Sequence, residues 1–226
     1  MTQLTVATPR VTRIERIDGT NGAGRKYRVS FDVGDPVLLP SVTTVLSAVW
    51  PKPWLVPWAR GVEREAIRAG LNEYVDDPLY GGQRTIERST VDAILKAASK
   101  RPEEVRDTAG DFGTRFHALV EHYLEEQPPR ELVWYAADLG AAFDNFRSWY
   151  MESELTVTLS EQMVYDLPLG YAGTFDATAR TREGRLVVVD WKSSNRMSDD
   201  YPVQLAAYAI ALEDMNGEAV NEAWVV

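Results

Sequence analysis

Alternation of apolar and polar residues marks the β structure in this chain. Tyr27, Val29 and Phe31 alternate with polar residues after a glycine-rich turn, which predicts a β-hairpin within the first forty residues. Three further strand-like runs occur at 155–164, 171–180 and 186–191. The last two are separated only by a short turn ending at Gly184, so we expect them to pair with each other.

Helical spacing of apolar residues, with proline and capping residues at the ends, marks the segments between these strands. Ser41 is expected to open a short helix, and Pro202 to open a later one that Gly217 closes. We predict helices after Ser41 and over 54–69, 89–100, 102–127, 132–152 and 203–215. A loop is expected over 72–88, a break between two helices at Pro102, and a last strand from Trp224.

This mixture of strands and helices predicts an α/β (α+β) fold. The chain shows no internal repeat and no linker long enough to separate domains. We therefore expect residues 1–105 to form a β-hairpin and helical elaboration that packs onto a core formed by residues 106–226.

Composition narrows the class of protein. With 226 residues, of which 45% are hydrophobic, the chain is long enough to bury a core. No apolar run approaches the roughly 20 residues of a membrane helix, and the first residues do not resemble a signal peptide, so we expect a cytoplasmic protein. The absence of cysteine excludes disulfides, thiol catalysis and cysteine-held iron–sulfur clusters. Any metal must be bound by oxygen and imidazole nitrogen.

The net charge of −10 argues against a protein that binds nucleic acid through a uniformly basic surface. The charge is unevenly distributed, however. Residues 1–116 contain 17 basic and 15 acidic residues, a balance of +2, whereas residues 117–226 contain 7 and 19, a balance of −12. The acidic residues are thus concentrated in the half of the chain that carries the candidate metal ligands.

The triplet Asp190-Trp191-Lys192 ends the most apolar of the predicted strands. Because side chains alternate along a strand, Asp190 and Lys192 are expected on one side, about 6 to 7 Å apart at their Cα atoms. Asp176 is expected on the partner strand of the same hairpin, next to Asp190. A carboxylate pair and an ammonium group in one cleft suit a site that holds a divalent cation against a phosphate.

His117 lies at the edge of the buried arc of the helix predicted over 102–127. If that helix packs over the strand ends, His117 completes a set of oxygen and imidazole ligands suited to Mg²⁺ or Mn²⁺. His122 is expected to face solvent on the other side of the helix. Taken singly, a helical histidine is more often an ordinary boundary residue.

Several further polar residues have both a functional and an ordinary interpretation. Gln204 and Tyr208 are one turn apart and are expected to face the strand ends, opposite a stripe formed by Leu205, Ala209 and Leu212. Glu161 is either a supporting acid of the metal site or an exposed strand residue. The arginines at positions 60, 64 and 68 form a row that either follows a DNA backbone or is simply solvated.

Four motifs occur in a fixed order: His117, Gly173-x-x-Asp176, Asp190-x-Lys192 and Gln204-x-x-x-Tyr208. This combination resembles the RecB-type exonuclease branch of the PD-(D/E)XK nuclease superfamily. The resemblance covers about residues 110–215. It implies a restriction-endonuclease-like core with a central mixed sheet flanked by helices.

The resemblance also implies roles for individual residues. His117, Asp176, Asp190 and the backbone carbonyl of Trp191 would bind one or two Mg²⁺ or Mn²⁺ ions, and Lys192 would be the catalytic lysine. The acids Asp176 and Asp190 would also take part in catalysis, together with Gln204 and Tyr208.

Members of this branch that carry an iron–sulfur cluster hold it with cysteines, which this chain lacks. What remains resembles the free-standing exonucleases of phage recombination and replication modules. The implied function is metal-dependent hydrolysis of DNA from its ends, in recombination, replication or repair, within the bacterial cytoplasm or a phage's host cytoplasm. DNA is the implied substrate, and a homo-oligomer or a single-strand annealing protein is the candidate partner.

Three alternatives stay open at this point. An endonuclease or nickase of the same fold would cut closed circular DNA. A protein that retains the fold without turnover would bind DNA and not cleave it. A histidine–aspartate phosphohydrolase would need more histidine ligands than the two in this sequence.

Overall fold

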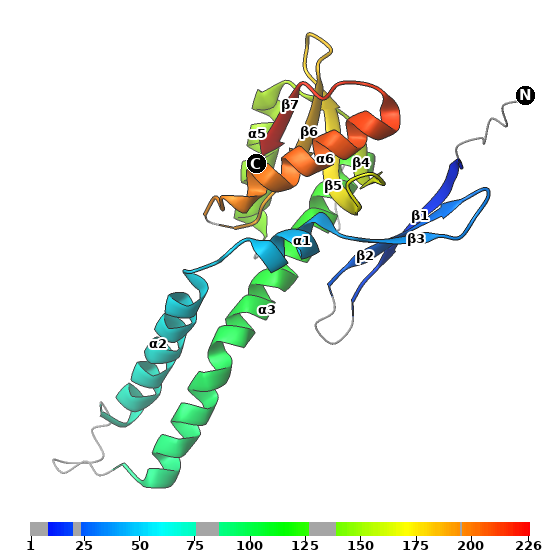
Figure 1. Ribbon diagram of the computed structural model, residues 1–226. Coiled ribbons are helices and arrows are strands. Elements are labelled where there is room, and N and C mark those ends of the chain that lie inside the picture. Colours follow the sequence, from blue (N-terminus) through cyan, green and yellow to red (C-terminus); the bar gives the residue numbers. More distant parts are fainter. Residues whose placement is uncertain (1–8, 20–23, 76–85, 127–138, 195) are drawn as a thin grey trace, which may run out of the picture. The chain divides into compact units, whose positions relative to one another are not determined.

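The computed structural model describes residues 9–19, 24–75, 86–126, 139–194 and 196–226 (Figure 1). The contacts within the chain define two compact units. The first unit comprises Met1–Trp50 and Arg115–Val226, and the second comprises Pro51–Thr114. The boundary expected at residue 105 falls inside a continuous helix, and the predicted division into domains stays a prediction.

A four-stranded mixed sheet forms the centre of the first unit. Its strands, in spatial order, are β4 (Thr156–Asp166), β5 (Tyr171–Arg180), β6 (Leu186–Asp190) and β7 (Glu222–Val225). β4, β5 and β6 are antiparallel neighbours, and β7 pairs with β6 in parallel. Every residue of β6 is buried, as expected for a continuous apolar run in a sheet covered on both faces. The predicted hairpin of β5 and β6 and the predicted last strand are confirmed.

Helices flank this sheet. α6 (Asp200–Asn216) lies across β4 to β7, and its Tyr208 and Leu212 share a core with Phe175 of β5 and Val188 of β6 (Figure 1). α6 ends at Gly217, whose φ of 68° is the left-handed conformation that favours glycine at this position.

A cluster of aromatic side chains joins a second helix, α5 (Gly140–Ser153), to the end of the sheet. Phe146 lies 5.3 Å from Trp191, measured between ring centroids, and 6.4 Å from Phe116 of α3 (Arg88–Glu126). Phe146 is buried and therefore belongs to the core. The helix predicted over 132–152 is confirmed from Gly140, and residues 132–138 lie outside the described part.

The N-terminal residues form a three-stranded antiparallel sheet. Its strands are β1 (Val11–Ile17), β2 (Lys26–Phe31) and β3 (Val37–Pro40). Tyr27 is fully buried, and its hydroxyl lies 2.8 Å from the hydroxyl of Thr174 in β5, which ties this sheet to the central one. α1 (Val42–Val49) follows, and the Ser41 side chain accepts a hydrogen bond from the Thr44 amide at 3.0 Å. The predicted hairpin and the predicted helix start are both confirmed.

The second unit consists of α2 (Leu55–Val75) and the first part of α3. The two helices approach closely at Gly70, where an added Cβ would lie 2.9 Å from Ile94 Cγ2. The predicted loop is wrong at residues 72–75 and at Arg88, which are helical, and it is confirmed at residues 86–87. Its residues 76–85 lie outside the described part.

The predicted break at Pro102 is wrong, because α3 continues through this residue. A proline inside a helix costs one backbone hydrogen bond. Pro102 nevertheless has the helical spacing of Ala98 and Val105, and all three are less exposed than their neighbours. Packing of this covered face therefore outweighs the lost hydrogen bond.

The observed architecture confirms the predicted fold class. A mixed sheet flanked by helices, with an N-terminal antiparallel sheet, is consistent with a restriction-endonuclease-like fold. Among the described residues, no helix combines the length and the apolar character that crossing a membrane requires.

Candidate active site

His117 and Asp176 meet where α3 passes the sheet. Phe116 and Val120 are buried and fix this turn of α3, while His117 is half-buried at its edge. His117 Nδ1 lies 3.0 Å from Asp176 Oδ1, and the backbone amide of Trp191 donates to Asp176 Oδ2 at 2.7 Å. Both oxygens of Asp176 are therefore held in place, and the predicted proximity of His117 to the strand acids is confirmed.

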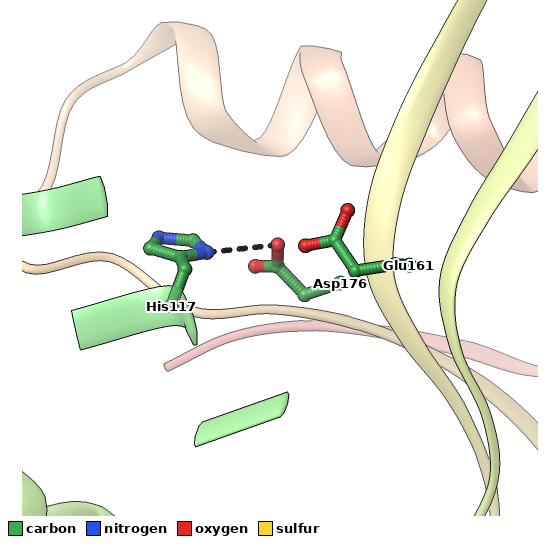
Figure 2. A group of neighbouring side chains, drawn as sticks. All are labelled: His117, Glu161 and Asp176. Carbon is green, nitrogen blue, oxygen red and sulfur yellow. Dashed lines mark hydrogen bonds and ion pairs between the residues drawn. The ribbon is translucent and has the colours of Figure 1, made fainter. Parts of the chain in front are cut away.

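Glu161 of β4 joins this pair (Figure 2). One ligand atom from each of His117, Glu161 and Asp176 can be chosen so that all three lie within 4.8 Å of one another. Along the β4–β5 ladder, Ser160 pairs with Ala177 and Gln162 with Phe175, so Glu161 and Asp176 lie between these two pairs. The half-buried position of Glu161 excludes its interpretation as an exposed strand residue.

The backbone of Glu161 adopts a left-handed conformation, with φ of 48°. This conformation is uncommon for a residue other than glycine and costs free energy, on the order of 1 to 3 kcal/mol. Strain of this kind is often found at functional sites, where the surrounding structure holds a side chain in a required direction. Here it aims the Glu161 carboxylate toward Asp176 (Figure 2).

Asp190 and Lys192 form the second part of the site. Asp190 is only 3% exposed, and Oδ2 of its carboxylate forms an ion pair with Lys192 Nζ. The ammonium group also lies 5.1 Å from the centroid of the Tyr201 ring. The main chain is fixed here as well, since Lys192 N donates to Val226 O at 2.7 Å and Val226 N donates to Asp190 O at 3.1 Å. The expected closeness of Asp190 and Lys192 is confirmed.

Two carboxyl groups of the site, those of Asp190 and Glu161, have raised pKa values. Burial, aided by the charge of Asp176, raises the pKa of Asp190 to about 6, although Lys192 acts in the opposite direction. Burial and the charges of Asp176 and Glu121 also raise the pKa of Glu161. A cation placed among these carboxylates would relieve both effects.

His117 responds differently because it can carry a positive charge. Burial disfavours the imidazolium, but the hydrogen bond and charge of Asp176 outweigh burial and raise the pKa of His117. A metal bound to Nδ1 would replace the proton shared with Asp176, so metal affinity should fall at low pH.

Gln204 and Tyr208 are both buried in α6, and Gln204 Nε2 donates to Tyr208 Oη at 2.7 Å. This hydrogen bond joins the two side chains to each other. The prediction that they lie opposite a stripe of Leu205, Ala209 and Leu212 is wrong, because Tyr208 and Leu212 belong to the same core cluster. α6 is covered over a wide arc, so polar and apolar residues share its buried side.

His122, expected to face solvent, is half-buried, and its Nε2 atom is buried. The prediction was wrong, because this side of α3 is also partly covered. The arginines at positions 60, 64 and 68 are exposed in the second unit.

The donor set fits a hard divalent cation. Glu161 and Asp176 offer carboxylate oxygens and His117 an imidazole nitrogen, which suits Mg²⁺ or Mn²⁺. Of the predicted ligands, His117 and Asp176 belong to this group, whereas the Asp190 carboxylate is paired with Lys192. Glu161, for which the sequence allowed two interpretations, is the acid that the structure adds to this group.

Comparison with known proteins agrees with this geometry. Residues 88–225, more than half of the chain, match the sequence model of the PD-(D/E)XK nuclease superfamily. The matched region begins with α3 and ends in β7, so it contains the site residues on α3, β4, β5, β6 and α6. A search of curated proteins found no significant match.

Proposed function

This chain belongs to the PD-(D/E)XK nuclease superfamily, and we propose that it is a divalent-metal-dependent DNA exonuclease of the RecB-type branch. Membership identifies it as a metal-dependent nuclease. The observation that supports the site is the group of His117, Glu161 and Asp176, next to a buried pair of Asp190 and Lys192. The cysteine-free sequence supports a branch member without an iron–sulfur cluster.

We propose His117, Glu161 and Asp176 as metal ligands, with Asp190 and the Trp191 carbonyl completing the set. Mg²⁺ or Mn²⁺ in such a site supplies Lewis-acid stabilisation of the phosphate and lowers the pKa of a bound water. The chain contributes the alignment: Trp191 N holds Asp176 Oδ2, and the strained backbone of Glu161 directs its carboxylate toward Asp176.

Lys192 is proposed as the catalytic lysine. Its ammonium group, held by Asp190 and by the face of Tyr201, can orient the attacking water and offset the negative charge that develops on the phosphate. The pairing also favours the ionised form of Asp190, which burial alone opposes. Lys192 therefore supports the charge of the buried Asp190.

Gln204 and Tyr208 are proposed to act by positioning. Tyr208 packs against Gly173 of β5, and the Gln204 hydrogen bond fixes the tyrosine hydroxyl. Burial raises the pKa of Tyr208, so its hydroxyl stays neutral and keeps its proton for hydrogen bonding. The pair thereby sets the distance between α6 and the strand that carries Asp176.

The biological setting belongs to the same proposal. We propose a role in phage or bacterial DNA recombination, replication or repair in the cytoplasm, supported by the four-motif resemblance. A homo-oligomer or a single-strand annealing protein as partner is supported by the net charge of −10, which leaves the isolated chain poorly suited to hold DNA by charge alone.

End-labelled duplex DNA, single-stranded DNA and closed circular DNA test this function with Mg²⁺, Mn²⁺ or EDTA. We expect metal-dependent release of nucleotides from ends, abolished in Lys192→Ala. Lys26→Ala, which removes an exposed lysine of β2, is the matched control and should retain activity. Degradation that persists in Lys192→Ala contradicts the proposed site, and cutting of closed circles contradicts the exonuclease assignment.

A further inference from the structure

The face of α2 that points away from α3 carries an unusual set of exposed residues. Trp54 is 53% exposed, and Arg60, Arg64 and Arg68 are also exposed. The backbone amide of Trp58 donates to Trp54 O at 3.0 Å, so Trp54 already follows the helical register. Steps of 100° per residue place the three arginines in a slanting row on the exposed half of α2, at about 120°, about 80° and about 40° round the axis from Trp54. We call Trp54 together with Arg60, Gly61 and Arg64 the α2 outer face.

The charge of the α2 outer face is not neutralised. Arg68 pairs with Glu65 at 3.1 Å. In the described part of the chain, Arg60 and Arg64 have no ion-pair partner. The sequence from 36 to 62 contains no aspartate or glutamate, and among the described residues the two acids that flank Arg64, Glu63 and Glu65, form no ion pair with Arg60 or Arg64. Two unpaired guanidinium groups one helical turn apart, about 6 Å along the axis, thus form a local positive site.

Gly61 lies within this face, and packing does not explain it. A Cβ added at Gly61 would meet no heavy atom within 4 Å. Glycine inside a helix is less stable than alanine, so a position with free space for a side chain would ordinarily favour alanine. Gly61 is two turns after Trp54, about 10 Å along the axis, and on nearly the same side, and its bare backbone lets a ligand approach α2 closely there.

We propose that the α2 outer face binds single-stranded DNA, with an unpaired base stacked on Trp54 and neighbouring phosphates bound by Arg60 and Arg64. This inference rests on the proposed function, which makes DNA the substrate. An aromatic ring next to cations is the usual chemistry of single-strand binding, because every base offers a flat face and the backbone offers charge. Since duplex DNA hides its base faces in the stack, Trp54 selects the unpaired strand.

Fluorescence anisotropy of a fluorescein-labelled oligothymidine tests the proposal, with EDTA present so that no cleavage occurs. We expect Trp54→Ala to weaken binding about tenfold and Trp54→Phe to retain most of it, since base stacking on an aromatic ring is lost only in the first. In Arg60→Gln/Arg64→Gln, the slope of log affinity against log salt should decrease by about 1.4, roughly 0.7 for each lost phosphate contact.

The matched control is Arg101→Gln/Arg106→Gln, which removes the same charge from exposed positions of α3 in the same unit. It should change neither affinity nor salt slope by a comparable amount. Thermal unfolding by circular dichroism checks that each variant is folded, and the exposure of Trp54 makes a large loss of stability unexpected.

Four outcomes would overturn the proposal. They are unchanged binding in Trp54→Ala, an equal loss of binding to blunt duplex DNA, an equal effect of the control substitutions, and a change in oligomeric state in place of a change in DNA affinity. Because binding is measured without cleavage, an inactive protein that still binds single strands through Trp54 contradicts only the nuclease function. An active nuclease whose binding ignores Trp54 contradicts only this inference.

Discussion

Gly173 of β5 has no room for a side chain. A Cβ built there would lie 2.3 Å from Tyr208 Cε1 and 3.0 Å from Cδ1. The tyrosine ring cannot easily move away, because it is 2% exposed and its hydroxyl accepts a hydrogen bond from Gln204. This contact explains physically why a glycine stands three residues before Asp176: it lets α6 pack closely against the strand that presents the acid.

The effect of Gly173→Ala follows from this geometry. Favourable carbon–carbon contacts lie near 3.5 to 4.0 Å, so the new methyl group would overlap the ring by more than about 1 Å. Overpacking of a buried site typically costs about 1 to 3 kcal/mol, whereas the reduced freedom of the unfolded chain returns about 0.4 to 1 kcal/mol. We expect the free energy of unfolding to fall by about 1 to 2 kcal/mol, and nuclease activity to fall with it as β5 shifts.

Urea unfolding, followed by circular dichroism, measures this change. In a Tyr208→Leu background the ring is absent, so Gly173→Ala should then cost little, and the double-mutant cycle should show a strong coupling. Gly140→Ala at the start of α5 is the control, because a Cβ there meets no heavy atom within 4 Å. The same loss in both backgrounds, or no loss in the wild-type background, would refute the argument.

Three further predictions concern charge and metal. The pKa of His117 is raised, so its charged pair with Asp176 stabilises the fold fully below the ordinary value of 6.5, and this stabilisation is lost as pH rises through the raised value. The difference in free energy of unfolding between wild type and His117→Gln, measured with urea, should therefore shrink as pH rises. Burial raises the pKa of Asp190 from 3.8 to about 6. As pH rises between these values, the free energy of unfolding of wild type should therefore fall by up to about 3 kcal/mol relative to that of Asp190→Asn, measured by urea unfolding in EDTA. Mn²⁺ at about 100 times its Kd should raise the free energy of unfolding by about 2.7 kcal/mol; Glu161→Gln should reduce that gain, while exposed Glu152→Gln should not.

Much of the fold follows from local sequence signals. The runs that become β5 and β6 have clear strand composition and a short turn, and Ser41 and Gly217 have the chemistry of helix caps. Such signals act over a few residues, so they predict an element without knowledge of its tertiary contacts. The proximity of His117 to the strand acids was also predictable, although it needed the order of the four motifs in addition to local pattern.

What could not be predicted depends on contacts between distant segments. Pro102 stays inside a helix because the covered face of α3 outweighs one lost hydrogen bond, and nothing in its neighbouring sequence shows that cover. His122 is half-buried although its helical position lies away from the arc of Phe116, Leu119 and Val120. In both cases the outcome depends on how much of the α3 surface is covered, which local sequence does not determine.

Glu161 shows most clearly how the site depends on strand register. Its position between the pairs Ser160–Ala177 and Gln162–Phe175 brings it to Asp176, and its left-handed backbone then turns the carboxylate toward Asp176. A shift of one residue in the β4–β5 register would place the Glu161 side chain on the opposite face of the sheet and remove it from the group with His117 and Asp176. The register itself is secured by buried residues such as Val164 and Phe175, which are remote in sequence from His117. The donor group is therefore a consequence of how the sheet pairs, and a substitution that loosens this pairing should impair metal binding without touching a ligand.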